Sequence, residues 1–352
     1  MPRRLLLTTT AALLSLTVFV RAADDLVLAR FSDYLDALRV QAGVPGLSAA
    51  IVGATSVTWE HAYGLQDVDR NIQARLDTPY QIDGLTQTVV AALLLRCADS
   101  GWISLDDRVG KYAPGTANAG ATLRQLLTHT SAGANGLVFN YSPGRLEPLA
   151  AAVAACTDSS FAFGVAGLLD KRLGMFDSVP GVDAIRAPLA QQFDAATVDR
   201  YSRTLTRLAV PYSVDSKGRP SPGSYAAATL TPGAGLVATL LDLEQFDLAE
   251  KRGVLVPIDT LVAAWTPPLD GSGQRLPHGI GWFLQTYNGE PVVWQFGVGD
   301  NASSSLMLLL PKRNLTLILL ANSQGLSRPF SLAAGDVTVS PFAKLFLGLF
   351  TR

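Results

Sequence analysis

The sequence is poor in charged residues and in residue types that bind metals or nucleic acids. Charged residues make up 16% of the 352 residues, and the formal net charge is −1. There is no run of basic residues and no interleaving of aromatic with basic residues, which argues against a nucleic-acid partner. The three histidines and two cysteines are far apart in the chain and lack the spacing of a metal site. We therefore expect no metal, no other cofactor and no nucleic-acid partner.

The two cysteines, Cys97 and Cys156, both lie in stretches rich in alanine and leucine that are typical of helices. Two alternatives stay open for them. In an exported protein the two thiols can form a disulfide, whereas buried free thiols behave as small hydrophobic groups. The geometry that decides between these alternatives is not contained in the sequence.

The first 22 residues have the pattern of a secretory signal peptide. Two arginines precede an apolar run over residues 5–20, and small residues follow at positions 22 and 23. We expect cleavage after Ala22, a single domain over residues 23–352, and export to the periplasm or the extracellular space. The alternative is an uncleaved membrane anchor, although this run is short for a membrane span.

Hydrophobic patterning predicts early strands, a helical middle and late strands. Strands are expected over residues 47–53, 56–64, 279–287, 291–297, 304–310 and 315–321. Helices are expected over residues 26–42, 88–99, 149–156, 163–173, 234–250 and 342–350, and a surface loop over residues 211–224. This order predicts an α/β protein of the α+β type, with one central antiparallel sheet flanked by helices. The sheet is expected from residues 44–64 and 279–322, and an inserted, mainly helical lobe from about 80–250.

Several motifs occur in the order and at the spacing of one known family. They are Val44-Pro45-Gly46, Leu105–Val109 with Tyr112-Ala113-Pro114, Thr122–Gly133, Gly233–Thr239 with Asp242-Leu243, and Gly279–Trp282. On these motifs the chain resembles the penicillin-recognising serine hydrolases: class C β-lactamases, D-alanyl-D-alanine carboxypeptidases and related esterases. The resemblance covers roughly residues 30–322 and implies the β-lactamase/transpeptidase fold.

The resemblance places the family's catalytic stretch at residues 80–89, which read Tyr-Gln-Ile-Asp-Gly-Leu-Thr-Gln-Thr-Val. The family has a serine at the start of a helix, where the helix dipole stabilises negative charge, and a lysine three residues later that accepts the proton. Gly84 stands in the place of the serine and Gln87 in the place of the lysine. Glycine offers no nucleophile, and an amide is not a useful proton acceptor at neutral pH.

Two further elements of the family motif are also altered. The family's Tyr-Ser-Asn reads Tyr141-Ser142-Pro143 here, and proline has neither a donor side chain nor a backbone N–H. Tyr141 is kept, either to assist proton transfer or as a packed aromatic residue. The family's His/Lys-x-Gly on a sheet-edge strand corresponds to Gln295-Phe296-Gly297, so that the positive charge is lost while Gly297 still permits close backbone approach.

Other polar residues are interpreted as structural. His129 is the best-preserved ionisable residue of the motifs, and the resemblance implies that it holds the loop after its helix rather than acting as a general base. Asp106 and Asp107 have the pattern of a loop and cap pair.

Two hypotheses follow for function. The first is a non-catalytic family member that binds a cell-wall peptide, a small molecule or a protein partner near the cell envelope. The second is an active hydrolase of the β-lactamase, carboxypeptidase or esterase type with a relocated nucleophile, for which Thr86, Thr88 and Tyr141 are the candidates. Thr86 lies about 200° around the helix from position 84, and Thr88 about one turn deeper. A third hypothesis is a purely structural role.

Overall fold

The computed structural model describes residues 25–225 and 228–351, and the predicted signal peptide therefore lies outside the described residues. A helix over residues 25–41 begins this part of the chain, close to the predicted 26–42. Within the described residues no single helix is long and apolar enough to cross a membrane. One bent pair, Pro143–Thr157 with Phe161–Leu173, meets that test of length and composition only when both helices are counted together.

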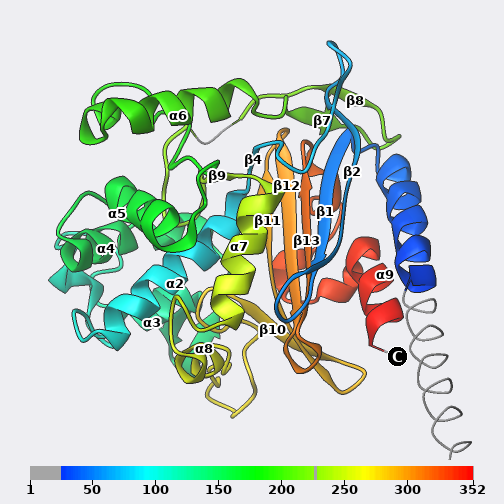
Figure 1. Ribbon diagram of the computed structural model, residues 1–352. Helices are drawn as coiled ribbons and strands as arrows, with labels where there is room; N and C mark the ends of the chain where they lie inside the picture. Colours follow the sequence, from blue (N-terminus) through cyan, green and yellow to red (C-terminus); the bar gives the residue numbers. More distant parts are fainter. Residues whose placement is uncertain (1–24, 226–227, 352) are drawn as a thin grey trace, which may run out of the picture.

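The centre of the molecule is a seven-stranded sheet in the order β10-β11-β12-β13-β1-β2-β3, with antiparallel pairing throughout (Figure 1). The strands are β1 Gly46–Val52, β2 Val57–Asp67, β3 Ile72–Gln73, β10 Phe283–Tyr287, β11 Glu290–Gly299, β12 Ser303–Leu310 and β13 Leu315–Ala321. The early and late strands meet where β1 pairs with β13. The predicted central antiparallel sheet is confirmed.

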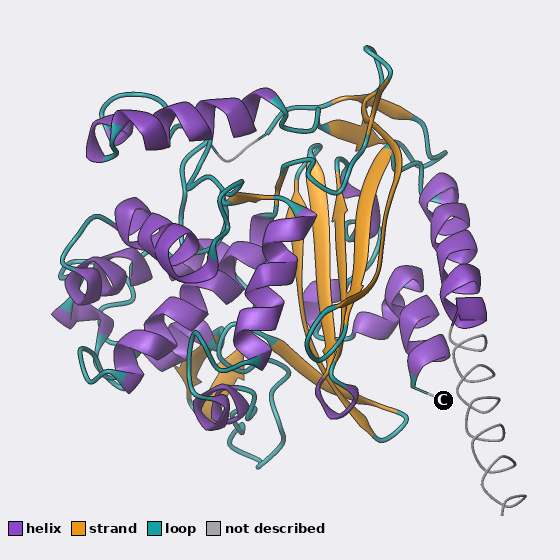
Figure 2. Ribbon diagram, viewed as in Figure 1, coloured by secondary structure: helices purple, strands orange, loops and turns teal. Residues whose placement is uncertain are grey.

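Helices cover both faces of this sheet, so the molecule has three layers (Figure 2). Alternate residues of β1 point to opposite sides, as the two-residue period of a strand requires. Leu47, Ala49 and Ile51 pack with the helix over 25–41 and with α9 (Pro341–Phe350). Ala50 and Val52 pack on the other side with α2 (Thr86–Asp99) and α7 (Leu240–Lys251). The terminal helices therefore cover one face and the middle of the chain covers the other.

The middle of the chain forms the mainly helical lobe on the left of Figure 1. Its helices are α3 Leu123–Leu127, α4 Leu149–Thr157, α5 Phe161–Leu168 and α6 Ala195–Thr206, and α8 Ile258–Ala264 follows after α7. A π-helical turn, Leu169–Leu173, continues α5. The predicted helices over 149–156, 163–173 and 342–350 are confirmed to within about two residues, the usual uncertainty of helix ends.

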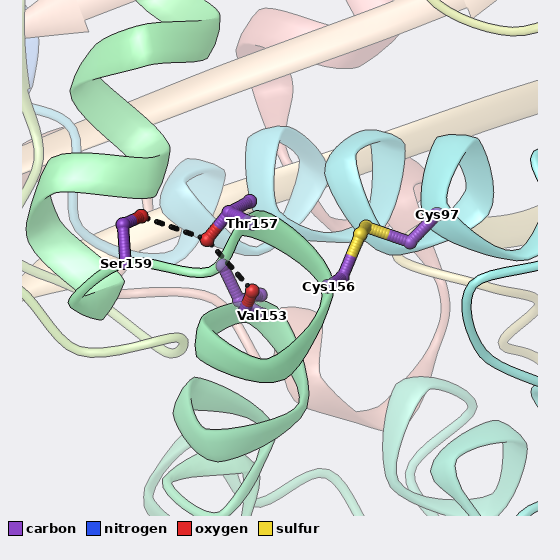
Figure 3. The surroundings of a disulfide bond; sticks show 5 residues. All are labelled: Cys97, Val153, Cys156, Thr157 and Ser159. Atoms are coloured by element: carbon purple, nitrogen blue, oxygen red, sulfur yellow. Dashed lines mark hydrogen bonds between the residues drawn. A yellow bond between two sulfur atoms is a disulfide. The ribbon is translucent and has the colours of Figure 1, made fainter.

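A disulfide joins Cys97 near the end of α2 to Cys156 near the end of α4 (Figure 3). Their α-carbons are 6.0 Å apart, within the normal range for a bridge. The alternative of two buried free thiols is therefore wrong. The bridge connects two helices of the lobe through cysteines that are 59 positions apart in the sequence.

Two segments differ from the sequence-based expectation. Residues 211–224 contain a hairpin, β7 Tyr212–Val214 with β8 Pro220–Pro222, instead of a loop without strands. The side chain of Asp215 accepts hydrogen bonds from backbone N–H groups of the turn, which organises it locally.

The helix predicted over 234–250 begins only at Leu240. Gly235 has a φ of +100°, which is incompatible with a right-handed helix, and Val237–Ala238 instead forms β9. This short strand pairs with β4 (Tyr80–Gln81), the segment that leads into position 84.

Candidate functional site

Gly84 lies in the 3₁₀ turn Asp83–Leu85, directly before α2, and this turn packs against β11. A β-carbon added at Gly84 would lie 2.3 Å from the backbone oxygen of Phe296 and 3.2 Å from the Tyr141 hydroxyl. Real β-carbons essentially never come closer than 3.0 Å to a neighbouring atom. The position that carries the serine in the family therefore has no room even for a methyl group here.

Gly297 forms the other side of this close contact. A β-carbon at Gly297 would lie 2.3 Å from the backbone oxygen of Ile82 and 2.8 Å from the backbone nitrogen of Gly84. The two glycines thus let the turn lie directly on the strand. The slot that the sequence predicted for close backbone approach is occupied by the chain's own backbone.

Asp83 was not recognised as a site residue from the sequence. It has a φ of +46°, in the left-handed region, and its carboxylate accepts a hydrogen bond from Ser303 Oγ at 2.7 Å. Burial raises the pKa of Asp83 to about 7. Ser305, on the same face of β12, donates to the backbone oxygen of Ile82 at 2.7 Å. These contacts anchor the turn to the sheet, and no local sequence pattern marks such a carboxyl group.

Gln87, one turn further along α2, takes part in a chain of hydrogen bonds. The backbone N–H of Ser142 donates to Nδ1 of His129 at 3.2 Å, so the proton of this imidazole is on Nε2. His129 Nε2 donates to Gln87 Oε1 at 2.8 Å, and Gln87 Nε2 donates to the Tyr141 hydroxyl at 2.8 Å. The Gln87 amide therefore accepts a hydrogen bond from the imidazole of His129 and donates one to the phenol of Tyr141 at the same time.

The chain continues from Tyr141 to the sheet. The Tyr141 hydroxyl donates to Gln295 Oε1 at 3.4 Å, and Gln295 Nε2 donates to Nε2 of His278 at 3.4 Å. His278 Nδ1 then donates to the backbone oxygen of Gly279 at 2.6 Å. The Tyr141 hydroxyl accepts one hydrogen bond and donates the next, and the direction of the whole chain follows from its two backbone ends.

His278 is the second residue that the sequence did not reveal. Its ring centroid lies 4.8 Å from that of His129, although 149 positions separate the two residues in the chain. Burial is the main reason that the pKa falls to about 2 for His129 and to about 3 for His278. Burial raises the pKa of Tyr141. At neutral pH the hydrogen-bond chain therefore contains only uncharged groups.

Aromatic side chains pack beside this hydrogen-bond chain. The ring of Tyr141 lies 5.3 Å from that of Phe296 and 5.1 Å from that of Phe283. Trp294 stacks on Phe283 at 4.4 Å. Four hollows on the described surface, with volumes from about 190 to about 540 Å³, are all lined by other residues.

The structure thus brings together five of the six site positions taken from the resemblance: Gly84, Gln87, Tyr141, Gln295 and Gly297. Pro143 lies two residues beyond Tyr141 and starts the 3₁₀ turn Pro143–Leu146. Its backbone oxygen packs against Gly233, where an added β-carbon would come within 2.6 Å. Pro143 has no part in the hydrogen-bond chain.

The hydroxyl groups near Gly84 have other partners. Thr86 Oγ1 accepts from the backbone N–H of Leu236 at 3.3 Å, and Thr88 Oγ1 donates to the backbone oxygen of Leu85 at 2.8 Å. Within the part of the chain that the structure describes, neither hydroxyl is hydrogen-bonded to a basic side chain, which an activated nucleophile requires.

Asp106 and Asp107 do not form a pair of catalytic carboxylates. Asp106 forms a salt bridge with Arg124 at 2.8 Å, whereas Asp107 accepts from the backbone N–H of Ser104 and from Lys111. Their separate partners are consistent with the loop and cap roles inferred from the sequence.

The fold is that of the β-lactamases and penicillin-binding proteins. The family model described as Beta-lactamase matches residues 31–337, and the chain belongs to this family. The Protein flp of Staphylococcus aureus (strain MW2) is 26% identical over 79% of the chain. The D-alanyl-D-alanine-carboxypeptidase/endopeptidase AmpH of Escherichia coli (strain K12) is 29% identical over 38% of the chain and 37% of its own length. The chain spans 60% of the length of the flp relative.

Solved structures agree on the fold. The octameric penicillin-binding protein homologue from Pyrococcus abyssi superposes with a TM-score of 0.72 at 17% identity, covering 91% of this chain and 77% of that one. FmtA from Staphylococcus aureus superposes with a TM-score of 0.69 at 15% identity, covering 92% of this chain and 89% of that one. The resemblance inferred from the sequence motifs is confirmed.

Proposed function

We propose that this protein is a non-catalytic member of the beta-lactamase family, and that it binds a ligand or a partner near the cell envelope. The contact between Gly84 and the backbone oxygen of Phe296 carries this proposal, because it leaves no room for a nucleophilic side chain. Loss of the nucleophile alone costs a serine hydrolase on the order of a million-fold in rate. Gln87 and Gln295 supply neither a base nor a charge, so no remaining group compensates for the loss.

The alternative, an active hydrolase with a relocated nucleophile, has weaker support. Thr86 and Thr88 bond to backbone groups, and the Tyr141 hydroxyl lies between two amide side chains. Because burial raises the pKa of Tyr141, its phenolate form is disfavoured. Among the described residues, none of the three hydroxyls is hydrogen-bonded to a basic side chain, which the alternative requires.

Covalent labelling distinguishes the two functions. The full chain is incubated with a fluorophosphonate probe and, separately, with benzylpenicillin at high concentration, and its intact mass is measured. We expect no adduct with either reagent. A stoichiometric adduct that peptide mapping places on Thr86, Thr88 or Tyr141 would establish the relocated nucleophile and overturn the proposal.

The binding role is tested with the same protein. Cell-wall fragments that end in D-alanyl-D-alanine, and fragments that lack this end, are compared by thermal shift, because a ligand that binds only the folded state raises its melting temperature. We expect a concentration-dependent rise with at least one fragment class or a stable protein complex from envelope extracts. A flat response to all fragments together with no complex would favour a purely structural role.

Export to the periplasm or the extracellular space remains part of the proposal, and it rests on the signal-like N-terminus. Fractionation of the producing cells, with mass spectrometry of the mature N-terminus, tests it. We expect the protein outside the cytoplasm with a chain that begins at Ala23. Retention of residues 1–22 in the membrane fraction would instead indicate an uncleaved anchor.

A further inference from the structure

A hollow of about 380 Å³ lies on the helical lobe, at the end of α2 opposite Gly84. It is bounded by the last turns of α2, by the turn between α4 and α5, by α5 itself and by the π-helical turn that follows. Apolar and glycine residues line its floor: Leu93, Gly164, Gly167 and Leu168. Nothing in the beta-lactamase-type site uses this hollow.

Three basic side chains, Arg96, Lys171 and Arg172, line the hollow. Among the described residues none of the three side chains forms a salt bridge or a hydrogen bond. The acidic residue next to them in the sequence, Asp170, is already paired with Arg200 at 2.5 Å. Three cationic groups therefore meet at one hollow without direct counter-ions.

This arrangement disfavours the charged form of Arg96, which is partly buried near the end of α2. Burial, and then repulsion from the Arg172 guanidinium, lower the pKa of Arg96. A neighbouring like charge disfavours the charged form of a group, and a bound anion would offset this repulsion. Asp158 is the one acidic residue among those that line the hollow, and the lining carries a formal net charge of +2.

The walls of the hollow are held in fixed positions. The disulfide joins Cys97, the neighbour of Arg96, to Cys156, the neighbour of Thr157, as Figure 3 shows. Thr157 Oγ1 donates to the backbone oxygen of Val153 at 2.9 Å and lies 2.9 Å from Ser159 Oγ. A binding site whose walls are held in this way loses little conformational freedom when a ligand enters.

The local backbone keeps the hollow open. Gly164 lets α5 approach Thr157, since a β-carbon there would lie 2.7 Å from Thr157 Oγ1. Gly167 has no heavy atom within 4 Å of its β-carbon position, so the space above it is free. The π-helical turn then places Lys171 and Arg172 at the rim; such turns are frequent at functional sites.

We propose that this hollow binds a phosphate group, carried by a small ester whose apolar part lies on Leu93 and Leu168. The planar guanidinium groups of Arg96 and Arg172 match the geometry of phosphate oxygens, and Lys171 adds a point charge. A phosphate monoester carries nearly two negative charges at neutral pH, which matches the net charge of the lining. The apolar floor favours an ester over inorganic phosphate.

Calorimetric titration of the full-length protein tests this site. Butyl phosphate, inorganic phosphate and butyrate are compared at constant ionic strength, since exposed electrostatic interactions are sensitive to salt. We expect saturable binding in the order butyl phosphate, inorganic phosphate, butyrate. Equal or tighter binding of butyrate would assign the hollow to carboxylates and overturn the proposal, as would the absence of saturable binding.

Variants locate the binding. Arg172→Gln and Lys171→Gln, both exposed, are each expected to weaken butyl phosphate binding about tenfold, because each removes a charge-assisted hydrogen bond. Arg186→Gln and Lys312→Gln remove exposed charges elsewhere and serve as matched controls without effect. Equal affinity of all four variants would overturn the proposal.

A gain of affinity provides the sharpest test, because damage to the fold does not produce it. Asp158 has a left-handed backbone (φ +48°), which asparagine also adopts readily, so Asp158→Asn keeps the turn and removes the negative charge at the rim. We expect butyl phosphate to bind this variant about threefold to tenfold more tightly. Unchanged or weaker binding would contradict the proposal, and neither result affects the labelling experiment on the family site.

Discussion

Gly84 lies so close to Phe296 that a β-carbon on the glycine would come within 2.3 Å of the backbone oxygen of the phenylalanine. This contact joins the turn before α2 to strand β11 at the point where the family places its nucleophile. The absence of a serine is therefore more than the loss of one hydroxyl, because the backbone has closed over the space that the side chain requires.

Gly84→Ser is expected to lower the free energy of unfolding by about 1–3 kcal/mol, since the added atoms overpack a buried contact. Gly84→Ala should cost a similar amount, because the clash begins at the β-carbon. Chemical denaturation of both variants measures the loss. Gly348→Ala, in α9 with nothing within 4 Å of its β-carbon position, is the control and should gain about 0.5–1 kcal/mol. A Gly84→Ser protein as stable as the wild type would show that the turn yields easily.

Gln87→Lys is expected to destabilise the fold by about 3 kcal/mol or more. The ammonium group would be buried among uncharged groups, and the N–H of His129 would lose its acceptor. Gln87→Met removes the same hydrogen bonds without adding charge and should cost less.

The pH dependence separates the two effects in these position-87 variants. A buried lysine has a lowered pKa, so the difference in stability between the lysine and methionine variants should shrink as the pH rises toward about 10. A constant difference would contradict the burial of a charge. The double variant Gly84→Ser with Gln87→Lys should form no adduct with benzylpenicillin. An adduct would show that the pocket opens.

Asp83 gives a pH dependence with a defined sign. Its carboxyl group has a pKa of about 7 in the folded protein and of 3.8 as a free side chain. Between these values the folded state holds a proton that the unfolded chain has released, so stability falls as the pH rises toward 7. Asp83→Asn lacks this titration and should gain stability relative to the wild type by about 1 kcal/mol per pH unit. Urea denaturation between pH 4.5 and 7.5 measures this difference.

Ser303→Ala is the companion variant for Asp83. The Ser303 hydroxyl donates to the Asp83 carboxylate and lowers its pKa, so removal of the hydroxyl should raise that pKa and extend the loss of stability to higher pH. A difference between Asp83→Asn and wild type that stays constant across this pH range would contradict the assigned burial of the carboxyl group.

The disulfide should contribute substantially to stability. It closes a loop of 59 residues, for which the reduction in unfolded-state entropy corresponds to about 4 kcal/mol. Cys97→Ala with Cys156→Ala should therefore unfold at a lower denaturant concentration than the oxidised wild type. Reduced wild type provides the matched control, since it has the same packing without the bond. Equal stability of the oxidised and reduced proteins would contradict this expectation.

The amino-acid sequence by itself determined the order of the elements and the family. The short runs of mostly apolar or small residues over 47–53 and 304–310, and the motif around His129, are local patterns that are readable without coordinates. Strands β1 and β12 are buried along their whole length because helices cover both faces of the sheet. The replacements at Gly84, Gln87 and Gln295 were equally visible, because the motif spacing assigns a role to each position.

Only the tertiary structure decided what fills the site and what joins the lobe. The meeting of His129 with His278, the left-handed conformation of buried Asp83 and the bridge from Cys97 to Cys156 all depend on distances between segments far apart in the chain. Local patterns carry no information about such distances. The closure of β11 onto Gly84 is a contact of this kind, since it needs glycine at two positions more than 200 residues apart.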